Sequence, residues 1–475
     1  MGENSIAIIH FVGVGGIGIS ALARYFLSQG AKVSGSDLES SELTDNLIRE
    51  GLSFYAGHAA TNIPRGTSRV IYSAAVRRMN PELQAARALG YKIQSYAQAL
   101  GELTKKYETI AVSGSHGKST TTALIGLILI EAGLNPTVIV GTKLREFSGK
   151  NFRRGESRHL VLEADEWNKS FHHYFPKIAV VTNIDNEHLD TYKTFSGVVA
   201  GFRRYLKNLK KGDTLVANYG DRSIRTLAKS VAKRGVNVIF YNRGRFPRHH
   251  LGIPGTFNQV NAEAAWQAWR VIANNANVTR NNAKKIAEKV FSNYRGSWRR
   301  FEKLNVECDM GHGIEGKTSC ISCRLSHVAL YSDYAHHPTE IKATLKAFRE
   351  RYPKKRVVCV FQPHQQDRLT RLFADFVHAF DAADTLILLP AYQVVGREEK
   401  SGKDSFALVQ EIRRRKTEAF YAADVASALK LLNHGIDSSS VIVFMGAGDM
   451  DSQVRKILGA SISIKNVIEY KHEPR

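Results

Sequence analysis

The sequence predicts an α/β protein with three domains: a Rossmann-like N-terminal domain, a P-loop ATPase-like central domain and a Rossmann-like C-terminal domain. A length of 475 residues suits about three domains of roughly 150 residues each. Short apolar runs alternate with amphipathic segments along the chain, which is typical of parallel sheets with helices between the strands. Two glycine-rich turns, at residues 13–18 and 114–119, each join a predicted strand to a predicted helix.

The composition is that of an ordinary globular protein, with 43% hydrophobic and 23% charged residues. The net charge is +23, but the lysines and arginines are scattered and form no nucleic-acid-binding motif. We therefore expect anionic small-molecule substrates and no nucleic acid. The longest apolar stretch, residues 123–130, is far shorter than the roughly 18 residues of a membrane span. With no signal-peptide layout at the start, we expect a cytoplasmic protein without a membrane partner, as a monomer or a homodimer.

The first predicted domain spans residues 1–107. A strand over residues 6–12 leads into a Gly-x-Gly-x-x-Gly turn, and a second strand over residues 32–36 ends at Asp37. The turn contains Gly13, Gly15, Gly16, Ile17 and Gly18. Such a turn holds a diphosphate, and the acidic residue accepts a hydrogen bond from a ribose hydroxyl. The residues alone leave both NAD and a nucleotide-sugar diphosphate open as ligands.

The second predicted domain spans residues 108–294 and begins with a phosphate-binding loop. A strand at residues 110–112 precedes the loop, and a helix begins at Thr120. The loop consists of Gly114, Ser115, His116, Gly117, Lys118 and Ser119. Glycines let backbone N–H groups turn toward phosphate oxygens, the helix N-terminus and the lysine add positive charge, and the serine hydroxyl can bind Mg²⁺. Because Val112 stands where the strict Walker pattern has its first glycine, the loop is a shortened variant.

Two later strands of this domain, at residues 160–166 and 178–183, end in polar residues. Ligands of an open α/β sheet bind at the carboxyl ends of its strands. Glu163 and Asp165 therefore lie where a Mg²⁺ ligand belongs, and so does His188. The alternative for either carboxylate is a solvated charge in a loop, and the alternative for His188 is a buried structural histidine.

A further helix of the central domain is predicted over residues 262–272. Asn258 and Asn261 stand just before it. Asparagine is a favoured N-cap, so the pair could simply cap the helix and have no part in ligand binding.

The third predicted domain, residues 295–475, contains three cysteines close together in the sequence. Cys320 and Cys323 have the spacing of half a zinc site, and Cys308 with His312 or His327 could complete it. Zinc sites more often use two close couplets, and glycines in the same stretch suit a turn. We therefore favour a β-hairpin with incidental cysteines over a metal site.

Taken together, these segments resemble the Mur ligases, ATP-dependent amide-forming enzymes of peptidoglycan precursor synthesis. The resemblance covers nearly the whole chain and is carried by residues 10–20, 114–119, 163–166, 182–185, 299–302, 333–338 and 361–364. Seven matches in the right order are far more specific than any one of them. The resemblance implies three domains that bind a UDP-sugar, ATP and an amino acid respectively.

The resemblance also assigns residues to substrates. UDP-N-acetylmuramate would be bound by Gly13, Gly15, Gly16, Ile17, Gly18, Asp37 and Ser73, with His58 and Asn62 as further matches. ATP would be bound by residues 114–120 together with Asn258, Asn261, Arg300 and Asp333. Mg²⁺ would be bound by Ser119, Glu163 and His188, and the amino acid by His337, His364 and Arg368. Lys118, His188 and Arg300 would be the catalytic residues.

The expected reaction joins L-alanine to the lactyl carboxylate of UDP-N-acetylmuramate through an acyl phosphate. Alternatives are the related recycling ligase that adds a tripeptide, an inactive Mur-like binding protein and, from the glycine turn alone, an NAD oxidoreductase. Three positions depart from the family pattern: Trp167-Asn168 follow Glu166, Phe257 replaces a histidine, and Gln365 replaces an arginine. The last change lies near the expected position of the amino-acid carboxylate, so it bears on which amino acid the protein uses.

Overall fold

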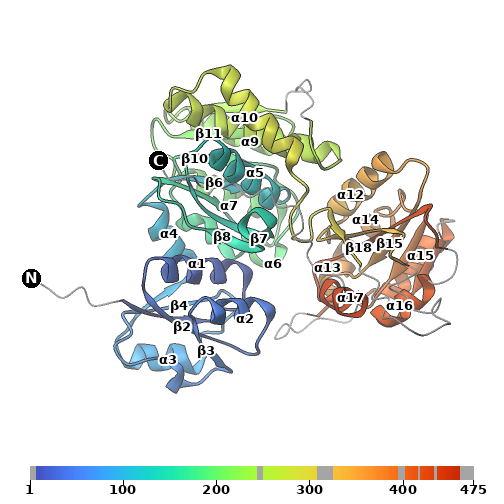
Figure 1. The fold of residues 1–475 in the computed structure, drawn as a ribbon, viewed down its shortest axis with the longest axis horizontal. Helices are drawn as coiled ribbons and strands as arrows, with labels where there is room; N and C mark the ends of the chain where they lie inside the picture. Colours follow the sequence, from blue (N-terminus) through green and yellow to red (C-terminus); the bar gives the residue numbers. More distant parts are fainter. Residues whose placement is uncertain are drawn as a thin grey trace, which may run out of the picture. The chain divides into compact units, whose positions relative to one another are not determined.

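The computed structural model describes residues 7–242, 250–306, 325–393, 402–415, 418–432 and 436–459. The chain forms two compact units, one of residues 1–250 and 260–292 and the other of residues 251–259 and 293–475. The described residues build three sheets, two in the first unit and one in the second. The α/β class predicted from the sequence is confirmed (Figure 1). The limits of the functional domains, near residues 107 and 294, stay a prediction.

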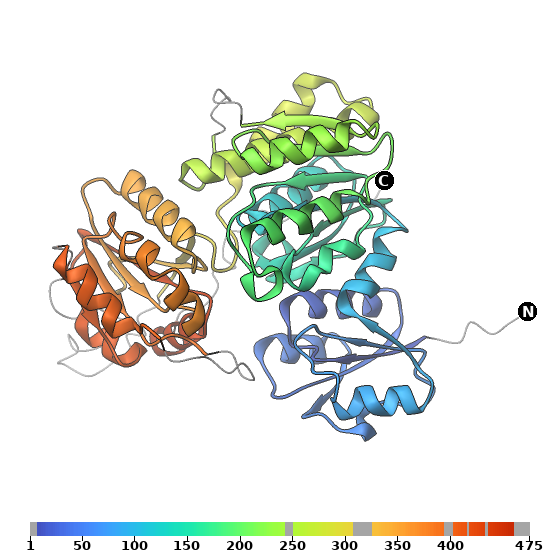
Figure 2. The same ribbon diagram turned by 180° about the vertical axis from the view of Figure 1, so that it is seen from behind.

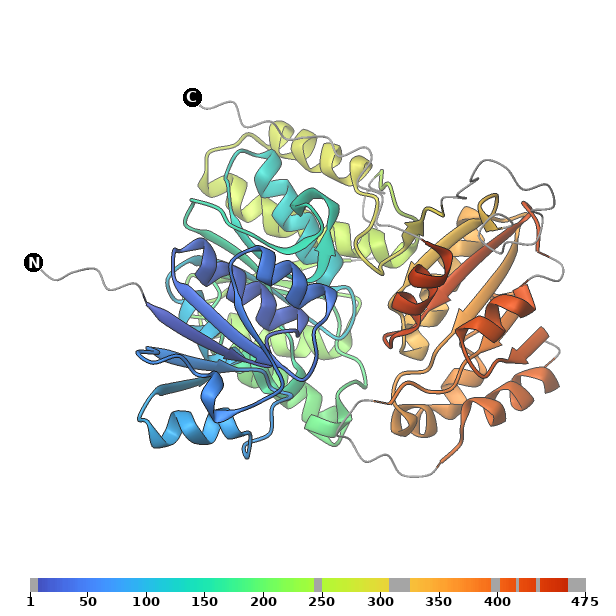
Figure 3. The same cartoon turned by 60° about the horizontal axis from the view of Figure 1, so that its bottom comes forward.

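The N-terminal sheet has five parallel strands in the order β3-β2-β1-β4-β5. Its strands are β1 Ile8–Val12, β2 Lys32–Asp37, β3 Ser53–Ala56, β4 Arg69–Tyr72 and β5 Lys92–Ser95. Its helices are α1 Ile17–Ser28, α2 Glu42–Arg49, η1 Ala60–Asn62, α3 Pro81–Ala88 and α4 Tyr96–Thr104. In Figure 3, α1 and α2 (dark blue) lie over one face of the sheet and later helices (light blue) over the other. This doubly wound arrangement matches the Rossmann-like prediction.

The central sheet has seven strands in the order β12-β11-β10-β6-β9-β7-β8. They are β6 Glu108–Ser113, β7 Thr137–Leu144, β8 Lys150–Arg153, β9 His159–Glu163, β10 Ile178–Val181, β11 Thr214–Asn218 and β12 Asn237–Tyr241. The helices are α5 Lys118–Glu131, η2 Arg145–Phe147, η3 Trp167–His173, α6 Leu189–Tyr192, α7 Phe195–Leu206, α8 Arg222–Ala232, α9 Thr256–Asn275 and α10 Arg280–Asn293. Only the edge strand β8 pairs antiparallel among these described strands, and its pairing with β7 contains a register shift.

The sheet of the second unit has six strands in the order β13-β14-β18-β15-β16-β17. They are β13 Glu302–Leu304, β14 Ala329–Asp333, β15 Arg356–Phe361, β16 Thr385–Leu388, β17 Glu418–Tyr421 and β18 Ser440–Met445. The helices are α12 Pro338–Arg351, α13 Gln366–Arg371, α14 Phe373–Val377, α15 Ser405–Arg414, α16 Val425–Leu432 and α17 Met450–Leu458. Figure 2 shows helices of this unit (orange) flanking its sheet. All neighbouring strands run parallel except the edge pair β13–β14.

Local sequence explains where several helices begin. Asn80 caps α3, since its side chain accepts from the backbone N–H of Glu82, and Pro81 occupies the first helical position. Helix α5 begins at Lys118, two residues before the predicted start, and it is buried from Ser119 to Leu129. Its apolar run at residues 123–130 suits this burial on all sides.

One expectation about helix starts is wrong. Helix α9 begins at Thr256, so Asn258 and Asn261 lie inside its first two turns and neither is its N-cap. The side-chain amide of Asn258 donates instead to the carbonyl of Pro254, just before the helix, at 2.6 Å.

The expectation about zinc stays open. Cys308, His312, Cys320 and Cys323 lie outside the described residues, whereas His327 lies in the turn just after that gap. Among the described residues the free cysteine is Cys359, which is buried in β15. No helix in the described ranges is both long enough and apolar enough to span a membrane.

Helix α1 of the N-terminal sheet packs against β7 and β8 of the central sheet (Figure 1). Asn151 on β8 makes this contact specific. Its side-chain oxygen accepts from Arg24 at 2.5 Å, and its amide donates to the carbonyl of Ile17 and to the hydroxyl of Ser20. Arg24 and Asn151 are both buried, and buried polar groups are normally hydrogen-bonded. Arg24 meets this need with Asn151 on one side and with Glu50, at 2.8 Å, on the other.

We expect Asn151→Ala to destabilise the protein by about 1–3 kcal/mol, because the buried Arg24 guanidinium would lose one of its two side-chain partners and keep only Glu50. The buried amide that donates to Ile17 and Ser20 would be lost as well. Thermal unfolding followed by circular dichroism measures this change. Asn237→Ala, on an exposed position of β12, serves as the control and should change stability by less than about 0.5 kcal/mol. Equal stability of the two variants would contradict a specific role for Asn151.

Candidate active site

The glycine turn of the N-terminal sheet is held by the end of β2. The N–H groups of Gly13 and Val14 both donate to the carbonyl of Ser36, at 2.8 and 3.0 Å. Gly13 has a φ of +79°, and a Cβ there would lie 3.0 Å from the Cβ of Ser73. The structure therefore brings Ser73 against this turn, as the resemblance implied.

Asp37 is also part of this turn. Its carboxylate accepts from the N–H of Gly15 at 2.7 Å and from its neighbour Leu38 at 2.8 Å. Gly16 caps α1 and has no side chain to satisfy the first N–H groups of that helix. The turn thus offers a helix N-terminus beside a carboxylate, which suits a diphosphate next to a ribose. Binding of the UDP-sugar by these residues stays a prediction.

The second glycine loop lies between β6 and α5 in the central sheet. Gly117 is the N-cap of α5 in the left-handed conformation, with a φ of +83°. A Cβ at this position would collide with the side-chain oxygen of Asn261. The loop therefore requires glycine on two grounds, backbone conformation and space, and Asn261 lies directly against it.

Asn183, at the end of β10, holds the first part of this loop. The N–H of Ser115 donates to its backbone carbonyl at 3.1 Å, and the N–H of His116 donates to its side-chain oxygen at 2.8 Å. Its amide in turn donates to the carbonyl of His116 at 2.9 Å. Two of the loop N–H groups are thus occupied, whereas the N–H groups of the first turn of α5 have no acceptor within the helix and are suited to a phosphate.

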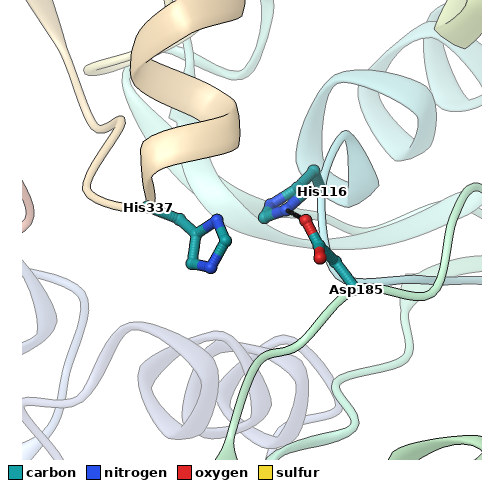
Figure 4. Close-up of side chains that lie close together, drawn as sticks. All are labelled: His116, Asp185 and His337. Carbon is teal, nitrogen blue, oxygen red and sulfur yellow. Dashed lines mark hydrogen bonds and ion pairs between the residues drawn. The ribbon is translucent and has the colours of Figure 1, made fainter. Parts of the chain in front are cut away.

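His116 points away from the loop toward Asp185. Its Nε2 lies 3.0 Å from a carboxylate oxygen of Asp185 (Figure 4). The backbone N–H of Asp185 is itself fixed by the hydroxyl of Ser115 at 2.8 Å. These contacts tie the loop to the segment that follows β10.

The ammonium of Lys118 is bound by a buried carboxylate. It donates to both oxygens of Glu166 at 3.0 Å, to the carbonyl of Gly114 at 2.7 Å and to that of Ser115 at 3.3 Å. The Glu166 side chain is 1% exposed, and the Nε2 of His188 lies 3.4 Å from it. Asp165, Glu166 and His188 form a group whose ligand atoms lie within 4.8 Å of one another. Lysine, carboxylate and imidazole therefore meet beside the loop, as the strand-end argument predicted for His188.

Lys118, Glu166 and His188 stabilise one another's charged forms, whereas Asp165 is disfavoured as a carboxylate by burial and by its neighbour Glu166. Burial alone would lower the pKa of Lys118, but Glu166 and Asp165 outweigh it and raise that pKa. Burial would raise the pKa of Glu166, yet Lys118 and His188 hold it below its usual value. Burial would lower the pKa of His188, but the contact with Glu166 raises it. Burial and the neighbouring Glu166 both raise the pKa of Asp165.

Ser119 and Glu163 form a second pair of oxygen ligands. The hydroxyl of Ser119 donates to Glu163 at 3.2 Å, and the other Glu163 oxygen accepts from the N–H of Gly141 at 2.8 Å. A hydroxyl and a carboxylate beside a phosphate loop are the hard oxygen ligands that Mg²⁺ prefers. This pair fits the predicted metal site, whereas His188 lies with Asp165 and Glu166, so its part in that site stays a prediction.

The remaining predicted residues lie in the second unit. Asp333 is buried and accepts from the N–H groups of Phe301 and Ala335, at 2.8 and 2.9 Å, and burial raises its pKa. Arg300 lies 3.7 Å from Glu340 and stacks over the ring of Tyr334.

The three residues predicted to bind the amino acid are also in this unit. His337 caps α12, where its Nδ1 accepts from the N–H of Thr339 at 3.4 Å. The ring of His364, at the end of β15, stacks on Tyr392, and Arg368 lies on α13. Their roles, like those of Asn258, Arg300 and Asp333, stay predictions.

The sequence argument missed two residues of the loop region, Glu166 and Asn183. Both belonged to motifs that carried the resemblance, but neither was given a role. A signal was available, because each is a polar residue just beyond a buried strand of a parallel sheet.

Sequence comparison identifies the class of protein that this fold and site define. Residues 8–108 match the catalytic domain of the Mur ligase family, residues 112–252 the Mur ligase middle domain, and residues 319–448 the glutamate ligase domain of Mur ligases. The chain belongs to the Mur ligase family.

Comparison with individual proteins shows which members of this family the chain is similar to. The chain is 35% identical to the UDP-N-acetylmuramate–L-alanine ligase of Caldanaerobacter subterraneus subsp. tengcongensis, over 95% of this chain and 97% of that protein. The solved UDP-N-acetylmuramate–alanine ligase MurC of Thermotoga maritima is similar with a TM-score of 0.75 and 24% identity, over 95% of this chain and 98% of that one. A murein peptide ligase of Psychrobacter arcticus is similar with a TM-score of 0.64 and 19% identity, over 97% of this chain and 99% of that one. At these identities the two solved structures support the fold alone.

We expect Gly117→Ala to weaken ATP binding by about tenfold or more, because the new methyl group strains a left-handed residue and displaces Asn261 from the loop. Isothermal titration calorimetry with ATP measures the effect. Gly133→Ala is the matched control: Gly133 follows the other end of α5 with a φ of +76°, but a Cβ there meets nothing within 4 Å. That variant carries the same kind of backbone strain and should bind ATP as the wild type does. Equal loss in both would show that strain alone is responsible.

Proposed function

We propose that this chain joins L-alanine to the lactyl carboxylate of UDP-N-acetylmuramate with hydrolysis of ATP, in the cytoplasmic stage of peptidoglycan precursor synthesis. The observation that carries the chemistry is the loop at Gly117, where a helix N-terminus, Lys118 and the Ser119–Glu163 pair converge. The choice of substrates rests on the 35% identity to an L-alanine ligase over nearly the full length of both chains.

The reaction requires an activated carboxylate, since a carboxylate ion is a poor acyl donor. The lactyl carboxylate attacks the γ-phosphorus of ATP, which forms an acyl phosphate and releases ADP. The amino group of alanine then attacks the acyl carbon, and the tetrahedral intermediate releases inorganic phosphate and a proton to leave the amide. Both steps spread negative charge over phosphoryl and carbonyl oxygens, so positioned cations and N–H groups supply most of the stabilisation.

Lys118 is suited to bind the transferred phosphoryl group. Its ammonium has three protons, and the structure gives it four acceptor atoms, of which the carbonyl of Ser115 is the most distant at 3.3 Å. A phosphate oxygen would therefore replace the weakest of these contacts first, while Glu166 keeps the lysine charged and oriented. Ser119 and Glu163 would hold Mg²⁺, which would neutralise charge on the phosphates when bound.

The second candidate is the recycling ligase that adds a tripeptide to the same UDP-sugar. One observation favours it: Gln365, where the family usually has arginine near the amino-acid carboxylate. Gln365 has a φ of +70° just before α13, and its N–H donates to the carbonyl of Tyr392. The chain thus keeps a left-handed backbone at Gln365 without the usual arginine. A site without that cation suits an amine substrate other than a free amino acid.

We expect phosphate release from ATP to require both UDP-N-acetylmuramate and L-alanine. A coupled phosphate assay that omits each substrate in turn tests the proposed function. Replacing L-alanine with the tripeptide L-alanyl-γ-D-glutamyl-meso-diaminopimelate identifies the recycling ligase if only the peptide supports turnover. A chain that binds the UDP-sugar without releasing phosphate with either amine would be the inactive binding protein instead.

We expect Lys118→Ala to lower kcat by about 100-fold or more, because one lost cation at a developing negative charge costs roughly 3 kcal/mol. The same assay at saturating ATP measures kcat. Lys177→Ala is the control, since Lys177 is an exposed lysine paired with Asp213. It stands just before β10, at the amino end of that strand, whereas the loop follows the carboxyl end of β6. Near-normal turnover by Lys118→Ala would refute the role of the loop in phosphoryl transfer.

A further inference from the structure

A buried glutamate lies beneath the glycine turn of the N-terminal sheet. Glu82 is the second residue of α3 and is 0% exposed. One of its oxygens lies 2.7 Å from the Nε2 of His10 and 2.8 Å from the hydroxyl of Ser36. The other lies 3.0 Å from the Nδ1 of His58 and 3.1 Å from the amide nitrogen of Asn62. Four donors from four different segments therefore share one carboxylate.

This carboxylate is ionised at neutral pH. Burial alone would raise the pKa of Glu82, but the hydrogen bonds from His10 and Ser36 outweigh burial and lower that pKa. Because an ionised carboxylate only accepts hydrogen bonds, the Nε2 of His10 and the Nδ1 of His58 must each carry a proton. Glu82 therefore fixes which ring nitrogen of each histidine is the donor toward it.

The network connects directly to the turn that is expected to bind the diphosphate. Ser36 donates its hydroxyl to Glu82, while its carbonyl accepts the N–H groups of Gly13 and Val14. The next residue, Asp37, accepts from the N–H of Gly15. A shift of Ser36 would thus move both the glycine turn and the carboxylate beside it. His58 is the histidine of the pair with part of its ring exposed, 15% of the side chain.

We propose that Glu82 is a positioning residue of the UDP-sugar site, which holds the glycine turn through Ser36 and orients His58. The inference rests on the proposed function, since it assumes that the turn binds UDP-N-acetylmuramate. A structural carboxylate would stabilise the whole domain. A positioning carboxylate changes the affinity for one substrate and leaves the chemistry of the bound complex alone.

Glu82→Gln is the direct test because it keeps the size of the side chain. An amide has one acceptor oxygen, so its NH₂ group would face two of the four donors. We expect KM for UDP-N-acetylmuramate to rise about tenfold or more, with kcat and KM for ATP within about twofold of the wild type, the pattern of lost ground-state binding. Steady-state phosphate release with each substrate varied in turn gives these constants.

Glu102→Gln is the matched control. Glu102 lies in the same domain and pairs with Lys92 at 3.1 Å and Gln94 at 2.8 Å, and its pKa is also lowered, against the effect of burial, by the contact with Lys92. It makes no contact with the glycine turn. All three KM values of this variant should stay within about twofold of the wild type.

Ser36→Ala provides a second variant if Glu82→Gln does not fold. It removes one donor to Glu82 and should raise KM for the UDP-sugar by about threefold or more. An unchanged KM for UDP-N-acetylmuramate in a folded Glu82→Gln or Ser36→Ala chain, or an equal rise in KM for all substrates, would overturn the inference. A wild-type chain that releases no phosphate would refute the proposed function itself, which is a separate result.

Discussion

The parallel pairing of β6 with β9 and β10 is the constraint on which the candidate active site depends. Val112 lies opposite Glu163, and Ser113 lies opposite Val181. The glycine loop, the Glu163 carboxylate and Asn183 therefore emerge at the same edge of the sheet, since parallel strands end together. Hydrogen bonds between residues distant in sequence then fix the loop. None of these contacts would form if one strand were shifted by a residue along its neighbour.

Each of the three sheets has a buried carboxylate near the residues predicted to bind its substrate. Glu82 accepts four side-chain donors, Glu166 binds a lysine and a histidine, and Asp333 accepts two backbone N–H groups. A buried carboxylate is costly unless its oxygens are satisfied, so each one imposes an arrangement on the segments that donate to it. Hydrogen bonds from side chains and backbone N–H groups to such a carboxylate thus fix the position of a loop, as hydrogen bonds between strands fix a sheet. Such residues make a site rigid before a substrate arrives.

The sequence was sufficient to predict the features that depend on order along the chain. The strands predicted at residues 6–12, 32–36, 110–112, 160–166 and 178–183, the two glycine turns and the position of Glu163 and His188 near the loop follow from periodicity and the parallel-sheet rule. The pairing of Lys118 with Glu166 could not be predicted, because it depends on the path of the backbone after β9, where Asn168 and Lys169 take left-handed conformations. The early start of α9 was missed for a similar reason, since its first turn is held by contacts that spacing does not reveal.

The outer strands of all three sheets are short. Strand β13 has three residues, β3, β5, β8 and β17 have four each, and β12 has five. Several inner strands are equally short, since β4, β10 and β16 also have four residues. The outermost strand of an open sheet carries unpaired N–H and carbonyl groups that can recruit a strand from another molecule. Short length, together with the irregular pairing of β8 and its basic ends at Lys150 and Arg153, makes these borders poor templates for such recruitment. The short outermost strands therefore disfavour aggregation through the borders of the sheets.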